Sequence, residues 1–172
     1  MRSWESIYAQ HYSEILKYCG NYSSSKEQAE DLCHDVFIKA YEKLDQFDPS
    51  IASIRTWLYR IARNYCLNKI RDTRRHKEIE KFCWSKSFFA TTTRLHIVSP
   101  SSGPETEIIN NDERDIFLNN LGDINAEQRE CLILKYYEDM SRNEIANILG
   151  IPVATVKSRL YYGLKSLREK LS

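Results

Sequence analysis

The stretch "SRNEIANILGIPVATVKSRLYYG", which runs from Ser141 to Gly163, brings two short helical patterns together at a glycine. A helix-turn-helix needs a small residue in its first helix, a residue that tolerates positive φ in its turn, and an apolar residue in its second helix. Ala146, Gly150 and Val156 supply these at the offsets that the motif uses. The stretch therefore predicts a helix-turn-helix, with an ordinary helical hairpin as the alternative.

The outer face of the second helix favours DNA binding. Hydroxyl groups and arginine can read base edges in the major groove, while lysines hold phosphates. Residues 157–170 hold five basic residues and one acid, which gives this helix a local positive field. A single unit of this kind binds DNA weakly, so it must dimerise or be carried by a larger assembly. The candidate DNA-binding residues are Thr155, Lys157, Ser158, Arg159 and Tyr162.

Composition narrows the class of protein. The chain has 172 residues, of which 42% are hydrophobic and 28% charged. Its net charge of +1 excludes a protein whose whole surface is basic. The sequence has no long apolar run and no secretory signal, so we expect a cytoplasmic protein without membrane insertion. The five cysteines form no C-x-x-C pair, so we expect reduced thiols packed as small apolar groups. No cofactor and no metal site are expected.

Apolar residues recur at helical spacing in most of the chain. Three such stretches, at 4–19, 29–44 and 54–65, predict a helical bundle in the first half, and no strand-like alternation competes with them. Ser25 and Gln28 have the spacing of a capping box at the start of the second stretch. In the second half, four helices are expected, the first from Ile108 and the last ending near Leu171. Asn125 with Gln128, and Ser141 with Glu144, repeat the capping pattern.

Between the two helical halves the periodicity fails. This segment is rich in Ser, Thr and Pro, as linkers are. We therefore predict an all-α chain of two small helical domains, 1–77 and 108–172, joined by a flexible linker, 78–107. Trp84, Phe88 and Phe89 are too apolar to stay wholly in water, so we expect them to dock on the first bundle, with cover by a partner as the alternative.

Charge is segregated between the second and third predicted helices. Acids outnumber lysines on the second, whereas residues 55–77 hold eight basic residues and one acid. Thr56, Arg60, Asn64 and Arg71 are predicted to follow one helical line, flanked by Asn68. Asparagine is a poor helix former, so these amides are best explained if they bind something. The segregation suggests a bridge between a basic protein and nucleic acid, with two solvated faces as the alternative.

These residues carry a resemblance to a known family. The stretch "AEDLCHDVFIKAYEKLDQF" followed by "RTWLYRIARNYCLNKIRD" is similar to the first conserved domain of bacterial sigma factors of the extracytoplasmic-function (ECF) class. The stretch "LGDINAEQRECLILKYYEDMSRNEIANILGIPVATVKSRLYYGLKSLREKL" resembles their promoter-reading C-terminal domain. The resemblance covers roughly 6–75 and 109–171, and the linker shows no useful match.

The resemblance implies a non-catalytic factor that binds core RNA polymerase, through its β′ clamp helices and β flap, and directs promoter recognition, DNA melting and transcription initiation. It also implies an anti-sigma factor as a partner. The loop from Phe47 to Ile54 corresponds to the loop that captures an extruded base, and the 155–162 face corresponds to the reader of the minus-thirty-five element. The resemblance assigns polymerase binding to Asp31, Leu32, Asp35, Val36, Phe37 and Lys39, and the minus-ten element to Arg60, Asn64, Asn68 and Arg71.

The sequence departs from the family pattern at a few positions. Arg63 stands where a small or aliphatic residue is more common, and the capture loop lacks a frequent glycine. Asp139 replaces a common glycine, which bears on the geometry of the turn.

Two other classes of protein fit the sequence less well than a sigma factor does. A helix-turn-helix regulator that acts without stable incorporation into the polymerase would need a ligand-binding or dimerisation domain, which the first half does not resemble. For an enzyme, Asp31 and Asp35 lack the further carboxylates or histidines that a two-metal site requires.

Overall fold

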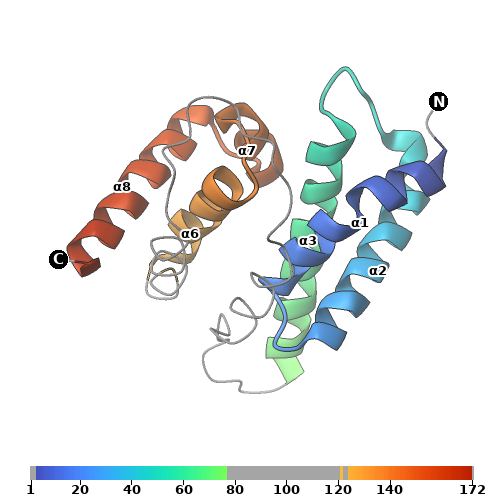
Figure 1. The fold of residues 1–172 in the computed structure, drawn as a ribbon, viewed down its shortest axis with the longest axis horizontal. Helices are drawn as coiled ribbons and strands as arrows, with labels where there is room; N and C mark the ends of the chain where they lie inside the picture. Colours follow the sequence, from blue (N-terminus) through green and yellow to red (C-terminus); the bar gives the residue numbers. More distant parts are fainter. Residues whose placement is uncertain (1–2, 77–120, 122–123, 172) are drawn as a thin grey trace. The chain divides into compact units, whose positions relative to one another are not determined.

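The structure is a computed structural model that describes residues 3–76, 121 and 124–171. All secondary structure in these ranges is helical, which confirms the predicted all-α class. The chain divides into two compact units, drawn in Figure 1. The first contains α1 (Trp4–Gly20), α2 (Lys26–Glu42), η1 (Leu44–Gln46) and α3 (Ile54–His76), and the later elements are α6 (Ala126–Leu132), the π-helical η3 (Ile133–Tyr137), α7 (Arg142–Leu149) and α8 (Val153–Leu171).

Some predictions concern residues that the structure does not describe. The linker, the helix expected from Ile108 and the cluster of Trp84, Phe88 and Phe89 all lie outside the described residues. In the ranges that are described, no helix has both the length and the apolar character needed to cross a membrane.

The helices α1, α2 and α3 form a three-helix bundle in which each helix packs on the other two. Figure 1 shows α1, α2 and α3 side by side. The apolar stripes predicted from the sequence supply much of the core, because residues three and four apart share a helix face, but Ala62 and Cys66 of α3 are buried without belonging to the predicted stripe. Tyr41 is the exception, since it belongs to the predicted α2 stripe but is exposed. The fully buried side chains include Ile15, Cys19, Ala29, Cys33, Val36, Leu58, Ala62 and Cys66.

Small sulfur side chains occupy the centre of this bundle. Cys19, Cys33 and Cys66 come from α1, α2 and α3, and the Cys19 and Cys66 Sγ atoms lie 4.0 Å apart. The contacts with the other two thiols and burial raise the pKa of the Cys19 thiol well above its ordinary range. With Cys131, the four described cysteines are free and buried, as expected of thiols packed as small apolar groups.

The predicted capping boxes differ in detail. The Ser25 hydroxyl accepts from the Gln28 amide at 3.2 Å as predicted, but the Gln28 side chain accepts from Ser24. Ser141 and Glu144 form both bonds, at 2.9 and 3.2 Å, and confirm the pattern. The Asn125 side chain also caps its helix, but it accepts from the amide two residues later and not from Gln128.

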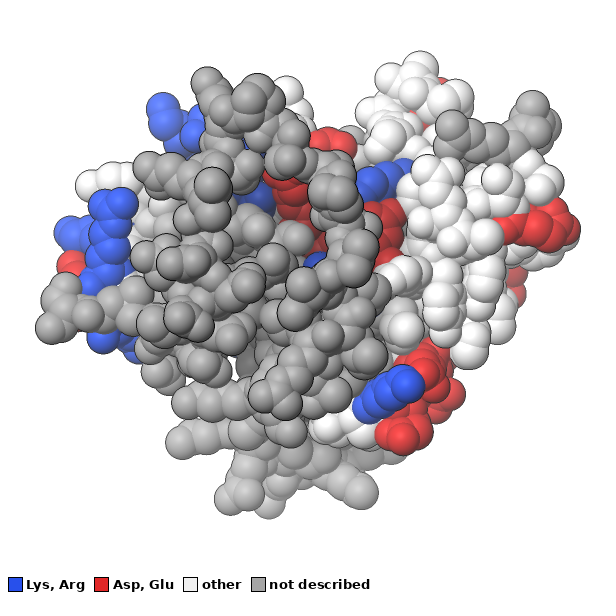
Figure 2. Space-filling model, in the orientation of Figure 1, with Lys and Arg blue, Asp and Glu red and all other residues white. Residues whose placement is uncertain are grey.

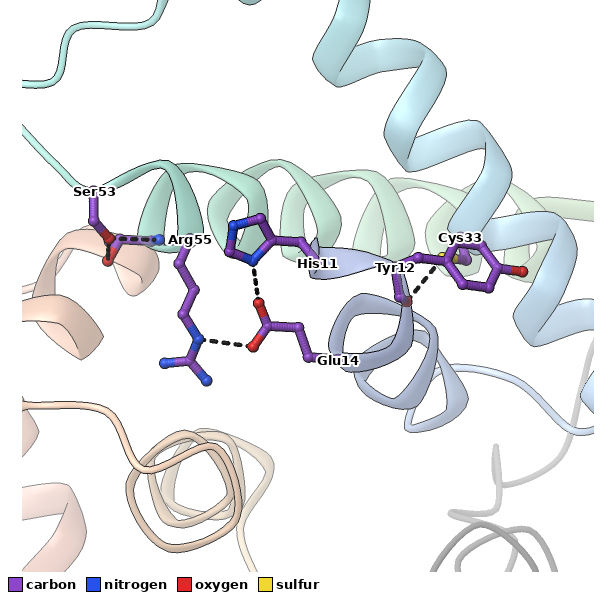
Figure 3. A network of polar contacts seen from close by, with 7 residues as sticks. His11, Tyr12, Glu14, Cys33, Ser53 and Arg55 are labelled. Atoms are coloured by element: carbon purple, nitrogen blue, oxygen red, sulfur yellow. Dashed lines mark hydrogen bonds and ion pairs between the residues drawn. The ribbon is translucent and has the colours of Figure 1, made fainter. Parts of the chain in front are cut away.

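A polar network joins α1 to the start of α3 (Figure 3). The Arg55 Nε donates to Glu14 Oε2 at 2.8 Å, and the His11 ring bonds to the other carboxylate oxygen. Burial raises the pKa of the Glu14 carboxyl, but the hydrogen bonds from His11 and Arg55 outweigh burial and hold that pKa below its ordinary value. Beside it, the Ser53 hydroxyl accepts from the Thr56 amide at 3.1 Å and caps α3.

In the later part of the chain, two residues with positive φ flank α7. Gly150 has φ +66°, which confirms the turn predicted for the helix-turn-helix. Asp139 has φ +52° at the position where the family often has glycine. Glycine also matters at Gly163, where an added Cβ would lie 2.9 Å from Leu132 Cδ1, so α8 passes close to α6 at this point.

We predict that Glu14→Gln lowers the free energy of unfolding of the first unit by about 1–2 kcal/mol at pH 7, because the neutral amide forms weaker hydrogen bonds. The folded pKa of Glu14 lies below the unfolded value of about 4.3, so its ionised carboxylate stabilises the fold above pH 4.3 and this contribution is lost as pH falls. The gap between wild type and variant should therefore narrow on acidification. Urea unfolding of the full chain at pH 7 and at about pH 3.5 measures this difference in the free energy of unfolding. An equal difference at both pH values would mean that the variant is destabilised by altered packing and not by the loss of the charge.

Candidate nucleic-acid and partner interfaces

The outer face of α2 combines acids with exposed apolar side chains. Ile38 is 56% exposed and Tyr41 61% exposed. On a helix, Asp31, Ile38 and Glu42 share one face, so acids precede and follow the isoleucine along it. Ile38 was not predicted as a site residue, although an isoleucine off the apolar stripe of an amphipathic helix is a detectable signal. Figure 2 shows acidic atoms gathered over the N-terminal end of α2.

The six residues predicted to bind the polymerase differ in exposure. Asp31 and Lys39 are exposed, and Leu32 and Asp35 are half-buried. Val36 and Phe37 are buried in the core of the unit. The Phe37 ring packs on Tyr8 at a centroid distance of 4.7 Å and on Trp4 at 6.1 Å. Val36 and Phe37 therefore hold α2 in place, and a partner on its outer face meets other side chains.

Asp35 links α2 to α3. The Tyr65 hydroxyl donates to Asp35 Oδ2 at 2.5 Å, and Lys69 Nζ lies 3.9 Å from the same oxygen. Burial, and then the hydrogen bond to Asp35, raise the pKa of the Tyr65 hydroxyl far above its ordinary range. Because its carboxylate already has partners inside the unit, Asp35 is less available to another protein than Asp31.

The predicted minus-ten residues form one stripe along α3. Arg60, Asn64, Asn68 and Arg71 follow each other at intervals of four, four and three residues, which places them on one helix face. Arg60 is half-buried and the other three are exposed. Thr56, predicted to begin this line, is buried, and its hydroxyl is hydrogen-bonded to Ser53 at 2.9 Å. Its four-residue spacing from Arg60 keeps Thr56 on the predicted line, but its side chain is buried and the exposed stripe begins after it.

The loop before α3 has a defined turn. Asp48 Oδ1 accepts from the backbone amide of Ser50 at 2.8 Å and from its hydroxyl at 2.7 Å, and these bonds lower the pKa of the Asp48 carboxyl. The Phe47 ring packs on Trp57 at 5.2 Å. Ile51, at the tip, is 66% exposed. The loop therefore holds an apolar side chain outward from a fixed turn.

The outer face of α8 carries most of the predicted minus-thirty-five residues. Lys157, Ser158 and Tyr162 are exposed, whereas Thr155 and Arg159 are half-buried. Tyr161 is also exposed, and its ring contacts that of Tyr162 at 5.3 Å. The sequence spacing places Tyr161 on the same outer face, because it follows Lys157 by four residues and Ser158 by three. Figure 2 shows basic atoms along α8.

Arg159 differs from its neighbours on α8. Its Nη2 lies 2.6 Å from Glu127 Oε2 on α6, so its guanidinium is directed along the edge of the helix that faces α6. The α8 face therefore has hydroxyl, lysine and tyrosine side chains in its middle and a paired arginine at one edge.

Comparison with known proteins bears on these surfaces. Sigma-70 region 2 matches residues 7–76, and Sigma-70, region 4 matches residues 121–167. The first match contains the α2 and α3 surfaces, and the second contains α6, α7 and most of α8.

Curated relatives match along most of the chain. The ECF RNA polymerase sigma factor SigW of Bacillus subtilis is 30% identical over 92% of this chain and 83% of its own length. The RNA polymerase sigma factor YlaC of Bacillus subtilis is 30% identical over 99% of this chain and 92% of its own length.

A solved structure shares the fold. The sigma factor RpoE of Bartonella quintana, solved in complex with the anti-sigma factor NepR, has a TM-score of 0.68 at 23% identity, covering 97% of this chain and 95% of that one. The residue types on the α2, α3 and α8 surfaces, the matches to both sigma regions in this order and the identity to SigW agree. The chain belongs to the extracytoplasmic-function class of RNA polymerase sigma factors.

Proposed function

We propose that this sigma factor docks on core RNA polymerase through the outer face of α2 and recognises promoter DNA with the stripe on α3 and the face of α8. The segregation of side chains carries the proposal, because an acidic helix with an exposed isoleucine packs directly on a helix that displays arginines and asparagines. One helix then faces a protein of opposite charge while the next faces nucleic acid.

For the polymerase, we assign direct contact to Asp31 and Lys39 and add Ile38 and Tyr41. An apolar anchor surrounded by charges has the composition of many protein interfaces, with the anchor giving affinity and the charges giving specificity. The partner surface is expected on the β′ clamp helices, and the β flap is expected to receive the C-terminal unit. Leu32, Asp35, Val36 and Phe37 contribute by holding α2 in position.

For the minus-ten element, Arg60, Asn64, Asn68 and Arg71 provide guanidinium and amide groups that bind phosphates and base edges. Melting requires bases to leave the stack, which costs a few kcal/mol for each flipped base and is offset by stacking and by a pocket. The fixed turn at Asp48 and the exposed Ile51 support capture of such a base by the loop before α3.

For the minus-thirty-five element, α8 enters the major groove with Lys157, Ser158 and Tyr162 in front, Tyr161 beside them, and Thr155 and Arg159 at the edges. A lone helix-turn-helix binds weakly, but two weak readers carried by one polymerase gain effective concentration. The predicted linker, 78–107, would allow both readers to engage one promoter.

We further propose that the chain acts in the bacterial cytoplasm without catalysis and that an anti-sigma factor holds it inactive. The complex of RpoE with NepR supports a protein inhibitor as the kind of regulator to seek. Polymerase and inhibitor would then compete for the outer face of α2.

Run-off transcription tests the function as a whole. Purified bacterial core polymerase, with and without this protein, would be supplied with genomic fragments from the source organism. We expect discrete transcripts only when the protein is present. Failure of the chain to associate with core polymerase at moderate salt, together with retained DNA binding, would instead indicate a regulator that acts outside the polymerase.

The docking surface has a specific test. We predict that Ile38→Ala weakens binding to core polymerase about tenfold, because removal of an interface anchor typically costs more than 1 kcal/mol. Fluorescence anisotropy of the labelled chain, titrated with core enzyme, measures the change. Ile51→Ala is the matched control, since Ile51 is exposed to a similar degree but lies in the loop. Equal affinities for all three proteins would exclude α2 as the docking face.

The minus-ten stripe has a second test. We predict that Asn64→Ala reduces open-complex formation by about tenfold, the cost of one lost base contact, while binding to closed double-stranded promoter stays near wild type. Permanganate footprinting and gel shifts on the same promoter separate the two steps. Asn143→Ala removes an exposed amide of α7 and serves as the control. Parallel losses in both assays would reject a role in reading a melted strand.

A further inference from the structure

The ion pair between Glu127 and Arg159 joins the first turn of α6 to the predicted reading helix, 32 residues further along the chain. The two side chains differ in exposure, because that of Arg159 is 22% exposed and that of Glu127 is 66% exposed. The carboxylate therefore stands at the rim of α6, and the guanidinium lies in the angle between the two helices.

A buried thiol lies near the same guanidinium. Cys131 follows Glu127 by one helical turn on α6 and so lies on the same side of that helix. Burial raises the pKa of the Cys131 thiol to about 11, and the positive charge of Arg159 acts in the opposite direction. Arg159 therefore lies beside the face of α6 that carries Glu127 and Cys131, and the bond to Glu127 holds it there.

The helix that provides these contacts is itself fixed against α8. At Gly163, one turn beyond Arg159, the α8 backbone passes so close to α6 that an added Cβ would meet Leu132 at 2.9 Å and Gln128 at 3.4 Å. At the other end, the Asn125 side chain accepts from the Glu127 amide at 2.9 Å and fixes the start of α6. The backbone that carries Glu127 is therefore fixed relative to α8.

A held arginine recognises its ligand differently from a mobile one. The guanidinium group is planar and has five N–H donors in fixed directions. When an acceptor binds the donors on one side of the group, the remaining donors point in a defined direction. Ordering the side chain before binding reduces the entropy lost on binding and restricts which groups the remaining donors can reach. The neighbouring Lys157 has no such anchor among the described residues and suits phosphates in many geometries.

We propose that Glu127 is a positioning residue that sets the promoter specificity of α8 by fixing the orientation of Arg159. This inference rests on the proposed role of α8 at the minus-thirty-five element and assigns no DNA contact to Glu127 itself. Arg159 presents its free donors at the α6 edge of the reading face, and Glu127 keeps them there.

The test measures discrimination between bases. The full chain, bound to core polymerase, is used to select a preferred minus-thirty-five sequence, and affinities are then measured for this sequence and for every single-base variant of it. For Glu127→Ala, we expect discrimination to fall about tenfold at the base pair where Arg159→Ala also lowers it, and to stay unchanged elsewhere. Affinity for unrelated DNA should not fall, because the variant removes a negative charge near phosphates.

Three further variants complete the design. Glu127→Gln should lie between wild type and Glu127→Ala, because its amide oxygen still accepts from the guanidinium. Glu169→Ala removes an equal charge from an exposed position on α8 and should leave discrimination unchanged. In an Arg159→Ala background, Glu127→Ala should have no further effect, since a positioning residue acts only through the group that it positions.

The outcomes separate this inference from the proposed function. If the wild-type protein showed no sequence preference, α8 would have no role in reading the minus-thirty-five element. This inference would then fail as well. A selective wild type with an equally selective Glu127→Ala variant would overturn this inference alone. If Glu127→Ala lowered discrimination equally at every base pair and also lowered the melting temperature, the ion pair would be only a structural link between α6 and α8. That result would also overturn this inference.

Discussion

The contact between α2 and α3 is the constraint on which the proposed interfaces depend. These helices carry opposite charge on their outer faces, and the Tyr65 hydroxyl joins them by a hydrogen bond to Asp35 at 2.5 Å. Each helix must also bury its apolar stripe in the same small core, so neither can turn without exposing that stripe. The direction in which the acids point relative to the asparagines of α3 is therefore fixed by packing and not by the charges themselves.

Much of this fold could be predicted from the sequence, because it depends on local periodicity. The three apolar stripes, the cap at Ser25 and the turn at Gly150 are all properties of short segments. Periodicity indicates which face of a helix is apolar, but not how far its neighbours cover that face. Tyr41 lies at the edge of its stripe and is exposed, whereas Thr56 lies on the polar line and is buried, with its hydroxyl hydrogen-bonded to Ser53.

The candidate site was predictable in its helices but less so in its side chains. A motif names consecutive positions, yet a helix turns by about 100° per residue, so Val36 and Phe37 point into the core while Ile38 points out. Contacts between distant segments leave no signal in one sequence. Glu14 with Arg55 and Glu127 with Arg159 are 41 and 32 residues apart. The pair of Glu127 and Arg159 is the more exposed of the two, and such surface ion pairs contribute about 0–1 kcal/mol to stability, so its greater effect is on orientation.

The sulfur atoms at the centre of the first unit bear on its dimensions. Where α1, α2 and α3 meet, the side chains are Cys19, Cys33 and Cys66, with alanines at Ala29, Ala40 and Ala62, all of them inaccessible to solvent. Small side chains bring helix axes closer together than leucines would, since interaxial distance follows the size of the residues at the contact. The separation between the outer faces of α2 and α3 therefore depends on the size of these core side chains, and a bulkier residue there would push the two faces apart without lying on either.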